Sequence, residues 1–152
     1  MMKAIKTMAL VALLVALFAT AAYAAINCHG GRCTGNSGSN TIYGTNGKDT
    51  IYGFGGSDDI SAQAGADHIY GGNGADVWLY GDYGNDVIEG GPSSDYLSGG
   101  GGTDRMFGGG GNDELSGSYD DGHARNVVRG GRGFDTCYVD KYDLTRSCEQ
   151  KY

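Results

Sequence analysis

Single apolar residues recur about nine positions apart in an otherwise polar, glycine-rich chain, from Gly35 to about Val139. Residues 44–61 show the unit clearly, because they read GTNGKDTIY and then GFGGSDDIS. Each copy has Gly at positions 1 and 4, Asp at position 6 and an aliphatic residue at position 8. A repeat of this length is typical of a solenoid, in which each copy packs only against its neighbours. Eleven copies can be laid along the chain, beginning at Gly35, Gly44, Gly53, Ala62, Gly71, Gly81, Gly90, Gly99, Gly108, Asp121 and Gly130.

Two positions of the repeat keep the same chemistry along the chain. Position 6 is Asp in nine copies and Asn in two. Alternate side chains of a strand face opposite sides, so position 8 should point inward and its two neighbours outward. Each copy therefore predicts one very short strand. Position 8 is apolar in all eleven copies, namely Ile42, Ile51, Ile60, Ile69, Trp78, Ile88, Leu97, Met106, Leu115, Val128 and Cys137.

The predicted fold is all-β: a parallel β-roll, or solenoid, of about eleven nonapeptide repeats with disulfide-capped ends. The glycines allow the sharp turns between strands. Two copies make one coil, and successive coils stack into two parallel sheets with strands about 4.8 Å apart. The position-6 side chains of copies n and n+2 then lie side by side in two rows. One row holds Asn40, Asp58, Asp76, Asp95, Asp113 and Asp135, and the other holds Asp49, Asp67, Asp86, Asp104 and Asn126.

Three irregularities interrupt the repeat. The copy at residues 62–70 begins Ala-Gln-Ala, so glycine is missing where the turn wants it, and we expect a weaker site there. Tyr80 is an extra residue, so the coil should bulge at that point. We expect Leu79 rather than the larger Trp78 to turn inward. Residues 117–120 form a four-residue insertion, which should loop out and interrupt the first row just before its last member.

Composition favours a cation as ligand over nucleic acid or an anionic membrane. The chain has 30 Gly, one Pro and a formal net charge of −7, and an acidic protein repels polyanions. Two stacked carboxylates and nearby turn carbonyls supply the oxygen ligands that Ca²⁺ takes. The small shell of Mg²⁺ and the ligand preference of Zn²⁺ fit less well. Because the interior has only about one apolar side chain per copy, we expect a largely unfolded chain without calcium and a folded chain with it.

The first 24 residues have the features of an export signal. Lys3 and Lys6 precede an apolar run over residues 8–22, and Ala-Tyr-Ala at residues 22–24 is a cleavage motif. We expect cleavage after Ala24 and a secreted mature protein without a membrane span, because the run is shorter than the roughly 20 residues of a spanning helix. An uncleaved anchor is the alternative. The expected organisation is a signal peptide at 1–24, an N-terminal disulfide cap at 25–34, a calcium-binding β-roll at 35–139 and a C-terminal cap at 140–152.

Four cysteines flank the repeats, and export would place them in an oxidising compartment. Cys28 and Cys33 precede the first copy, whereas Cys137 is the inward residue of the last copy and Cys148 follows it. Of the three pairings that four cysteines allow, we favour Cys28–Cys33 and Cys137–Cys148, because the two ends of a stacked coil lie far apart. A redox or zinc site is the alternative, although Cys-x4-Cys with one adjacent His is a weak zinc signature.

The nonapeptide resembles the haemolysin-type (RTX) calcium-binding repeat over residues 35 to about 139. The resemblance implies a parallel β-roll with several Ca²⁺ ions in the Gly-Asp turns, about six to eight given the rows above. No H-E-x-x-H or G-x-S-x-G motif is present in the sequence, so we expect a non-enzymatic protein. The implied ligands are Asp49, Asp58, Asp67, Asp76, Asp86, Asp95, Asp104, Asp113 and Asp135, with Asn40 and Asn126 at or near the row ends.

A partner surface is the alternative basis for function. Tyr43, Tyr52, Tyr70 and Phe107 occupy outward positions, and Tyr52 and Tyr70 should be neighbours on one sheet face. Cross-strand packing of aromatic rings accounts for such residues, and so does a face that contacts a cell surface or polysaccharide. The first hypothesis is thus a secreted calcium-binding β-roll whose folding depends on calcium. The second is an extracellular adhesion or matrix module in which the calcium is structural.

Overall fold

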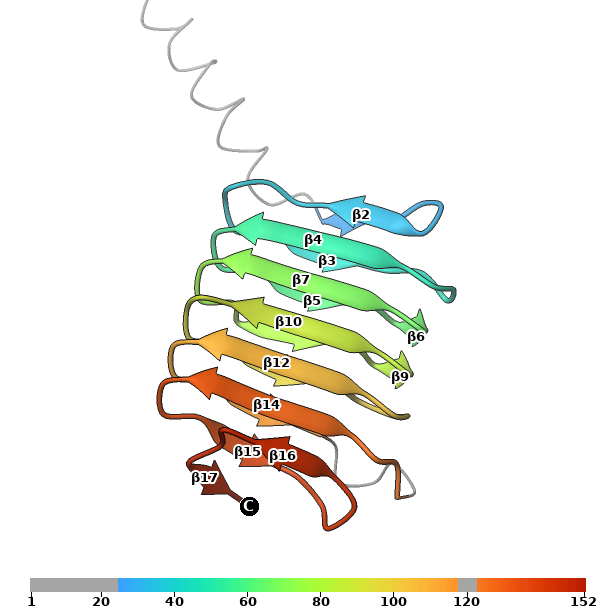
Figure 1. Ribbon diagram of the computed structural model, residues 1–152. Helices are drawn as coiled ribbons and strands as arrows, with labels where there is room; N and C mark the ends of the chain where they lie inside the picture. Colours follow the sequence, from blue (N-terminus) through green and yellow to red (C-terminus); the bar gives the residue numbers. More distant parts are fainter. Residues whose placement is uncertain (1–24, 118–122) are drawn as a thin grey trace, which may run out of the picture.

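The computed structural model describes residues 25–117 and 123–152, which form an all-β solenoid of about seven turns with no helix in these ranges (Figure 1). The coils stack along one axis in chain order, so that segments adjacent in the stack are about two copies apart in sequence. No helix long and apolar enough to cross a membrane occurs among the described residues. The predicted signal peptide at residues 1–24 lies outside them.

Two parallel sheets make up the roll, and they face each other across the interior. A separate two-stranded sheet joins β6 (Ala64–Gly65) to β9 (Tyr83–Gly84) in the turns. Sheet A, in spatial order, consists of β1 (Ile26–Asn27), β3 (Thr41–Tyr43), β5 (Asp59–Ser61), β8 (Trp78–Tyr80), β11 (Tyr96–Ser98), β13 (Glu114–Ser116), β15 (Thr136–Tyr138) and β17 (Gln150–Lys151). Sheet B, in spatial order, consists of β2 (Arg32–Thr34), β4 (Thr50–Gly55), β7 (His68–Asn73), β10 (Val87–Gly91), β12 (Arg105–Gly110), β14 (Val127–Arg132) and β16 (Leu144–Arg146).

The strand register stacks equivalent positions of the repeat on one another. Ile42 pairs with Ile60 in sheet A, and Ile51 pairs with Ile69 in sheet B. The parallel β-roll predicted from the nonapeptides is therefore confirmed. The structure has more strands than the eleven copies supply, because the segments outside the copies add β1 and β2 at one end and β16 and β17 at the other, and β6 and β9 form in the turns of two copies.

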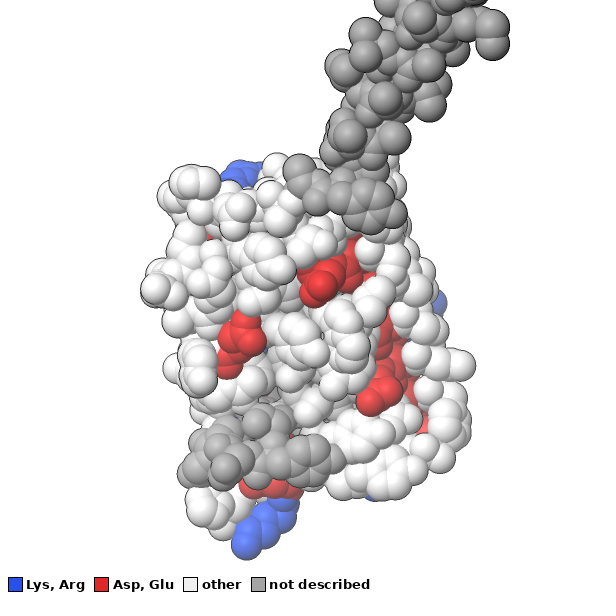
Figure 2. All heavy atoms as spheres, turned by 180° about the vertical axis from the view of Figure 1, so that it is seen from behind, with Lys and Arg blue, Asp and Glu red and all other residues white. Residues whose placement is uncertain are grey.

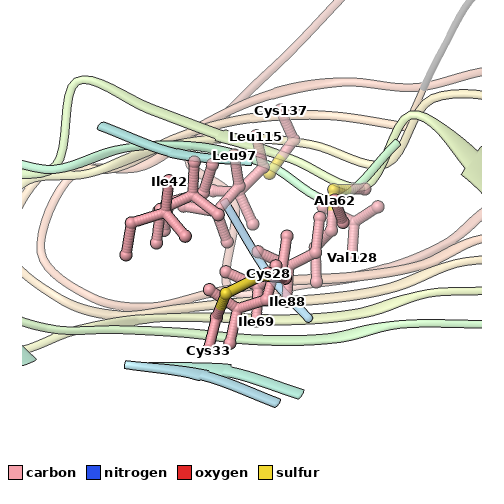
Figure 3. Close-up of a cluster of buried hydrophobic side chains, with 14 residues drawn as sticks. Cys28, Cys33, Ile42, Ala62, Ile69, Ile88, Leu97, Leu115, Val128 and Cys137 are labelled. Atoms are coloured by element: carbon pink, nitrogen blue, oxygen red, sulfur yellow. A yellow bond between two sulfur atoms is a disulfide. The ribbon is translucent and has the colours of Figure 1, made fainter. Parts of the chain in front are cut away.

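The core is two columns of position-8 side chains that meet between the sheets (Figure 3). Leu79 is fully buried in its column and pairs with Ile60 and Leu97, whereas Trp78 is 38% exposed, so the expectation for this copy is confirmed. The bulge itself does not fall at Tyr80. The backbone N–H groups of Val77 and Trp78 both donate to the carbonyl of Asp58, at 3.0 and 3.4 Å. The extra residue therefore lies at Val77, just before the strand.

Both ends of the core are closed by the predicted disulfides, Cys28–Cys33 and Cys137–Cys148. Cys33 is the inward residue of β2 and pairs with Ile51, while Cys137 is the inward residue of β15 and pairs with Leu115. Cys28, Cys33 and Cys137 are buried and belong to the core cluster. Each disulfide therefore lies at the point where the apolar residues of one column end.

The copy that was expected to begin at Asp121 begins earlier in the structure. The N–H of Gly117 donates to the carbonyl of Tyr138 at 2.9 Å, in the same way that Gly99 donates to Ser116 at 3.0 Å. Gly117 is thus the first residue of its copy and not part of an insertion that precedes it. The additional residues follow Gly117, and residues 118–122 lie outside the described part of the chain.

Candidate metal centre

Position-6 side chains form two continuous rows, one beside each sheet. In each row the backbone N–H of one residue donates to the side-chain oxygen of its equivalent in the next coil. Asp58 N–H donates to Asp76 Oδ1 at 3.0 Å, and Asp76 N–H donates to Asp95 Oδ1 at 2.9 Å. In the second row, Asp67 N–H donates to Asp86 Oδ1 at 2.8 Å. The same contact links the remaining members, which are Asn40 to Asp58, Asp95 to Asp113, Asp49 to Asp67, Asp86 to Asp104 and Asp104 to Asn126.

The extra residues after Gly117 do not interrupt the first row, contrary to the expectation from sequence. Asp113 N–H donates to Asp135 Oδ1 at 2.9 Å, the same distance as between Asp95 and Asp113. The register explains this continuity, because β13 still pairs with β15 and carries Leu115 onto Cys137. An insertion in a turn lengthens the loop without shifting the strands that hold the row.

Sequence reasoning missed one acidic residue at the end of each row. Asp135 N–H donates to Glu149 Oε2 at 2.8 Å, and Asn126 N–H donates to Asp143 Oδ1 at 2.9 Å. Both residues directly precede a short strand, as the position-6 residues do. The residues that pair with Val128 and Cys137, namely Thr145 in β16 and Lys151 in β17, are polar, so the apolar half of the repeat pattern is lost there.

In eight of the described carboxylates of the rows, one oxygen is buried without a donor. The position-6 residues from Asp49 onward are 4% exposed or less. In these eight residues one oxygen accepts a backbone N–H, but the other one lacks a protein partner. A buried carboxylate oxygen without a hydrogen bond is unfavourable unless a cation or a proton compensates its charge. Among the described residues, such an oxygen is present in Asp49, Asp58, Asp67, Asp76, Asp86, Asp95, Asp113 and Asp135.

The unpaired oxygen lies beside a backbone carbonyl, in a space bounded by the first glycine of the copy. A Cβ added at Gly90 would lie 2.5 Å from Asp95 Oδ2 and 2.7 Å from Gly108 O. A Cβ added at Gly81 would lie 2.6 Å from both Asp86 Oδ2 and Gly99 O. These glycines are required for the close approach of two oxygens. A carboxylate oxygen without a donor and a carbonyl oxygen that face one space are suited to a hard cation.

The protonation equilibria of the rows agree with this geometry. Burial raises the pKa of Asp86 and Asp95 to about 7 and that of Asp76 and Asp113 to about 6. The donated backbone N–H opposes the shift in each case, and neighbouring carboxylates of the row add to it. Near neutral pH these sites therefore favour a bound positive charge, either a proton or a cation.

The donor set fits calcium better than zinc. Within the described ranges, no three His, Cys, Asp or Glu side chains converge on one point. A bound metal would thus take carboxylate oxygens from neighbouring coils and complete its shell with backbone carbonyls and water. An all-oxygen shell of flexible geometry is the coordination that Ca²⁺ prefers, whereas Zn²⁺ prefers nitrogen and sulfur ligands.

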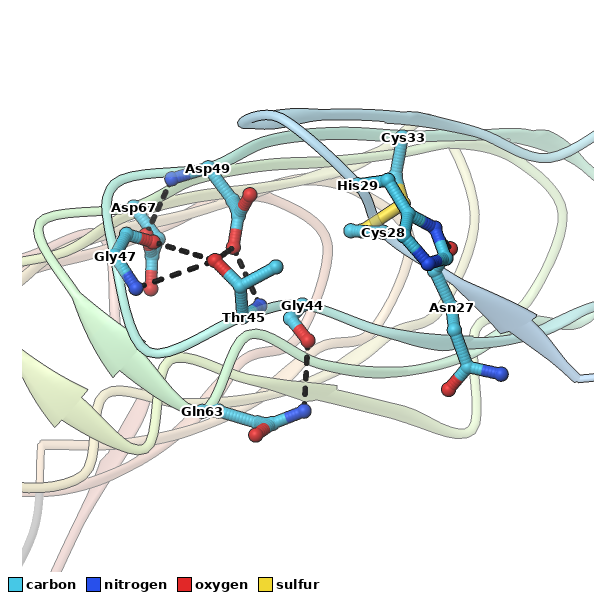
Figure 4. The surroundings of a disulfide bond; sticks show 10 residues. All are labelled: Asn27, Cys28, His29, Cys33, Gly44, Thr45, Gly47, Asp49, Gln63 and Asp67. Atoms are coloured by element: carbon cyan, nitrogen blue, oxygen red, sulfur yellow. Dashed lines mark hydrogen bonds between the residues drawn. A yellow bond between two sulfur atoms is a disulfide. The ribbon is translucent and has the colours of Figure 1, made fainter.

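One turn near the start of the second row differs from the others (Figure 4). The N–H and Oγ1 of Thr45 donate to Asp49 Oδ2 at 2.6 and 2.9 Å, and Gln63 Nε2 donates to the Gly44 carbonyl at 2.7 Å. In this turn, protein donors therefore occupy oxygens whose equivalents in other turns are candidate cation ligands. The copy at residues 62–70 was expected to hold a weaker site because it begins Ala-Gln-Ala and lacks glycine at position 1. The side chain of Gln63 gives that prediction a second physical reason.

Comparison with known families agrees with the geometry of the rows. A family model described as the RTX calcium-binding nonapeptide repeat (4 copies) matches residues 34–67, 52–77 and 80–115. These segments contain most of both rows. Neither the search of curated proteins nor the search of solved structures gave a significant match.

Proposed function

The chain belongs to the RTX calcium-binding nonapeptide-repeat family, and we propose that it is a secreted, non-enzymatic β-roll whose folding is stabilised by calcium. The observation that carries the proposal is the pairing of a buried, donor-less carboxylate oxygen with a carbonyl oxygen at successive turns. Repulsion within such a row opposes folding in the absence of a cation. An ion that binds only the folded rows would offset this repulsion and shift the equilibrium toward the roll.

The proposed ligands are the position-6 carboxylates of neighbouring coils. Each inner residue, such as Asp95, has one equivalent above it and one below it in its row. Each carboxylate would thus contribute to two successive ions, and about six to eight ions fit the two rows. Asn40 and Asn126 lie at or near the row ends and would contribute a neutral oxygen. The bound ion would supply charge compensation, while the backbone N–H groups hold one oxygen of each carboxylate in place.

The secreted location is supported by the N-terminal sequence and by the cysteines. The first 24 residues have the charge and apolar pattern of an export signal. The two disulfides are typical of proteins that mature outside the reducing cytosol. Extracellular fluids also contain millimolar-range calcium, which suits sites of modest affinity.

Far-UV circular dichroism of the purified, disulfide-bonded protein tests the proposal. The protein is first freed of calcium with a chelator and then titrated with CaCl₂, with MgCl₂ at equal concentrations as the matched comparison. We expect a cooperative gain of β signal with calcium and little change with magnesium, because Mg²⁺ requires a small octahedral shell. A spectrum that is already β-rich in chelator and unchanged by calcium would contradict the proposal.

An adhesion module is the second candidate, and one cluster on sheet A favours it. The rings of Tyr52 and Tyr70 on sheet B stack on each other at 4.8 Å, as expected of neighbours, so cross-strand packing accounts for them. On sheet A, Trp78 is 38% exposed and contacts Tyr80 at 5.6 Å and Tyr96 at 4.5 Å. Such a cluster offers ring faces to a sugar polymer. Loss of polysaccharide binding in a Trp78→Ser variant with unchanged calcium affinity would support adhesion, and a wild-type protein that binds no polysaccharide would exclude it.

The charge distribution supports a cation over a polyanion as the main ligand. On the face turned away from Figure 1, acidic side chains form separate patches among uncharged ones, and the larger basic areas lie toward the margins (Figure 2). A nucleic acid requires a continuous basic surface that tracks its phosphates. The net charge of −7 makes such binding unfavourable for the molecule as a whole.

A further inference from the structure

We propose that the C-terminal cap completes one more cation site, formed by Asp135, Glu149 and the backbone carbonyl of Ser147. The site rests on the proposed function of the rows, but two of its three groups lie outside the nonapeptide copies. It would couple the bound ion to the segment that closes the end of the roll.

Asp135 supplies a buried oxygen that faces this site. Its side chain is 0% exposed, its Oδ1 accepts the N–H of Asp113 at 2.9 Å, and its Oδ2 has no hydrogen-bond partner. A Cβ added at Gly130 would contact both Asp135 Oδ2 and the Ser147 carbonyl oxygen. The space beside Gly130 is therefore bounded by the same pair of oxygens as the space beside Gly90. The difference is that the carbonyl comes from the cap and not from another copy.

Glu149 occupies the place of the next position-6 residue in the row. Its Oε2 accepts the N–H of Asp135 at 2.8 Å, just as Asp135 accepts the N–H of Asp113. Asp135 thus has a carboxylate on both sides, as inner members of the row do. The longer side chain of Glu149 reaches this position from a tail that is exposed to solvent.

The cap is held against the last coil by several contacts. The N–H groups of Glu149 and Gln150 donate to the Asp135 carbonyl at 3.0 and 3.1 Å. Strand β17 pairs with β15, and the disulfide ties Cys148 to Cys137. Glu149 and Ser147 are the two residues adjacent to Cys148, so the disulfide positions both groups of the proposed site.

The second row ends in a different way, which makes the proposal specific to the first row. The Nδ2 group of Asn126 donates to the Gly117 carbonyl oxygen. A protein N–H group therefore satisfies this oxygen, and no ion is needed there. Both oxygens of Asp143 accept backbone N–H groups, from Asn126 at 2.9 Å and from Asp140 at 3.0 Å. The end of the second row is closed by hydrogen bonds, whereas the end of the first row, at Asp135, leaves an oxygen for a cation.

The test is the number of calcium ions bound by the Glu149→Gln variant. Gln keeps an oxygen that can accept the N–H of Asp135, so the variant removes charge with little change in shape. The matched control is Glu114→Gln, which removes an exposed carboxylate on β13 outside both rows. Ion numbers are measured by equilibrium dialysis and by isothermal titration calorimetry on the disulfide-bonded protein. We expect Glu149→Gln to bind one ion fewer than wild type and Glu114→Gln to bind the wild-type number.

Hydrogen exchange gives a second readout at the cap itself. Calcium should slow exchange of the amides at residues 144–152 in wild type and in the control, and should slow it much less in Glu149→Gln. If Glu149→Gln fails to fold, Gly130→Ala serves instead, because its Cβ would fill the same space. An unchanged ion number together with unchanged protection of the cap would overturn the proposal. A wild-type protein that binds no calcium would instead refute the function of the rows as a whole.

Discussion

Filling one of the spaces beside a position-1 glycine would test whether these spaces hold ions. In Gly90→Ala the new Cβ would lie 2.5 Å from Asp95 Oδ2, 2.7 Å from Gly108 O and 3.1 Å from Asp95 Cβ. Carbon–oxygen contacts of that kind must open by several tenths of an ångström, and overpacking of a rigid interior costs about 1–3 kcal/mol. Loss of one ion removes about 2.7 kcal/mol more when calcium is at 100 times its Kd. We therefore expect a loss of about 4–6 kcal/mol in saturating calcium.

The assay is urea unfolding followed by far-UV circular dichroism in saturating calcium, combined with calorimetric counting of bound ions. Gly110→Ala is the control, because its Cβ would meet Pro92 O at 3.5 Å, an ordinary contact. It should change the free energy of unfolding by less than about 1 kcal/mol and leave the ion number unchanged. Gly90→Ala should bind at least one ion fewer than the control.

A Gly90→Ala protein with the wild-type ion number and the stability of the control would refute the reasoning. In that case the paired oxygens beside the glycine do not face an ion, and the rows bind calcium elsewhere or not at all. The natural residue Ala62 offers the reverse substitution, since it already holds position 1 of its copy and is fully buried. Ala62→Gly should strengthen calcium binding at the start of the second row.

Three further predictions concern the core, pH and the C-terminal disulfide. Leu97→Ala should lower the free energy of unfolding in calcium by about 2–5 kcal/mol, because Leu97 is fully buried in a single column; a loss below about 1 kcal/mol in urea unfolding would contradict this. Without calcium, residual β structure should become more stable as pH falls from 8 to 5, because burial raises the pKa of Asp86 and Asp95 to about 7, above the unfolded value of about 3.9. The folded state then binds more protons than the unfolded state, so this stabilisation is full below pH 4 and is lost as pH rises through 7. Circular dichroism in chelator at several pH values measures the stability of the β structure. A stability that increases with pH would disprove the prediction. Replacing Cys137 and Cys148 by Ser should lower stability by about 2–3 kcal/mol and raise the calcium concentration at the folding midpoint, whereas an unchanged midpoint would show that the cap does not depend on the bond.

The regular part of the fold could be predicted from the sequence because two chemical signals coincide. The position-8 residues fix which side chains point inward, and the period of nine fixes which copies are neighbours. Together they predicted the pairing of Ile51 with Ile69 and the contact of Asp49 with Asp67. Turn residues were harder to place. The extra residue at Val77 leaves the strand that follows it unchanged, so the sequence alone does not say on which side of Trp78 the bulge falls.

Parts of the site could not be predicted because they depend on contacts between coils. The amide of Gln63 reaches the Gly44 carbonyl across 19 positions of sequence, and no local pattern indicates that contact. Glu149 was missed because the residue two positions later, Lys151, is polar where the repeat has an apolar residue. A row can be extended by a carboxylate if the segment after it still forms backbone hydrogen bonds with the neighbouring strand. An apolar residue at position 8 is not required.

The short strands at the two ends of the stack bear on how separate molecules meet. A pile of parallel strands exposes unpaired N–H and C=O groups at its first and last layer, and a second molecule could add there to grow a filament. The end strands β1 and β17 have two residues each, and β2 and β16 have three, compared with six in β4, β7, β12 and β14. Each end therefore offers only a few backbone N–H and C=O groups for pairing. A loop closed by a disulfide also crosses each end. The same caps that close the interior thus limit end-to-end polymerisation of a protein whose architecture would otherwise favour it.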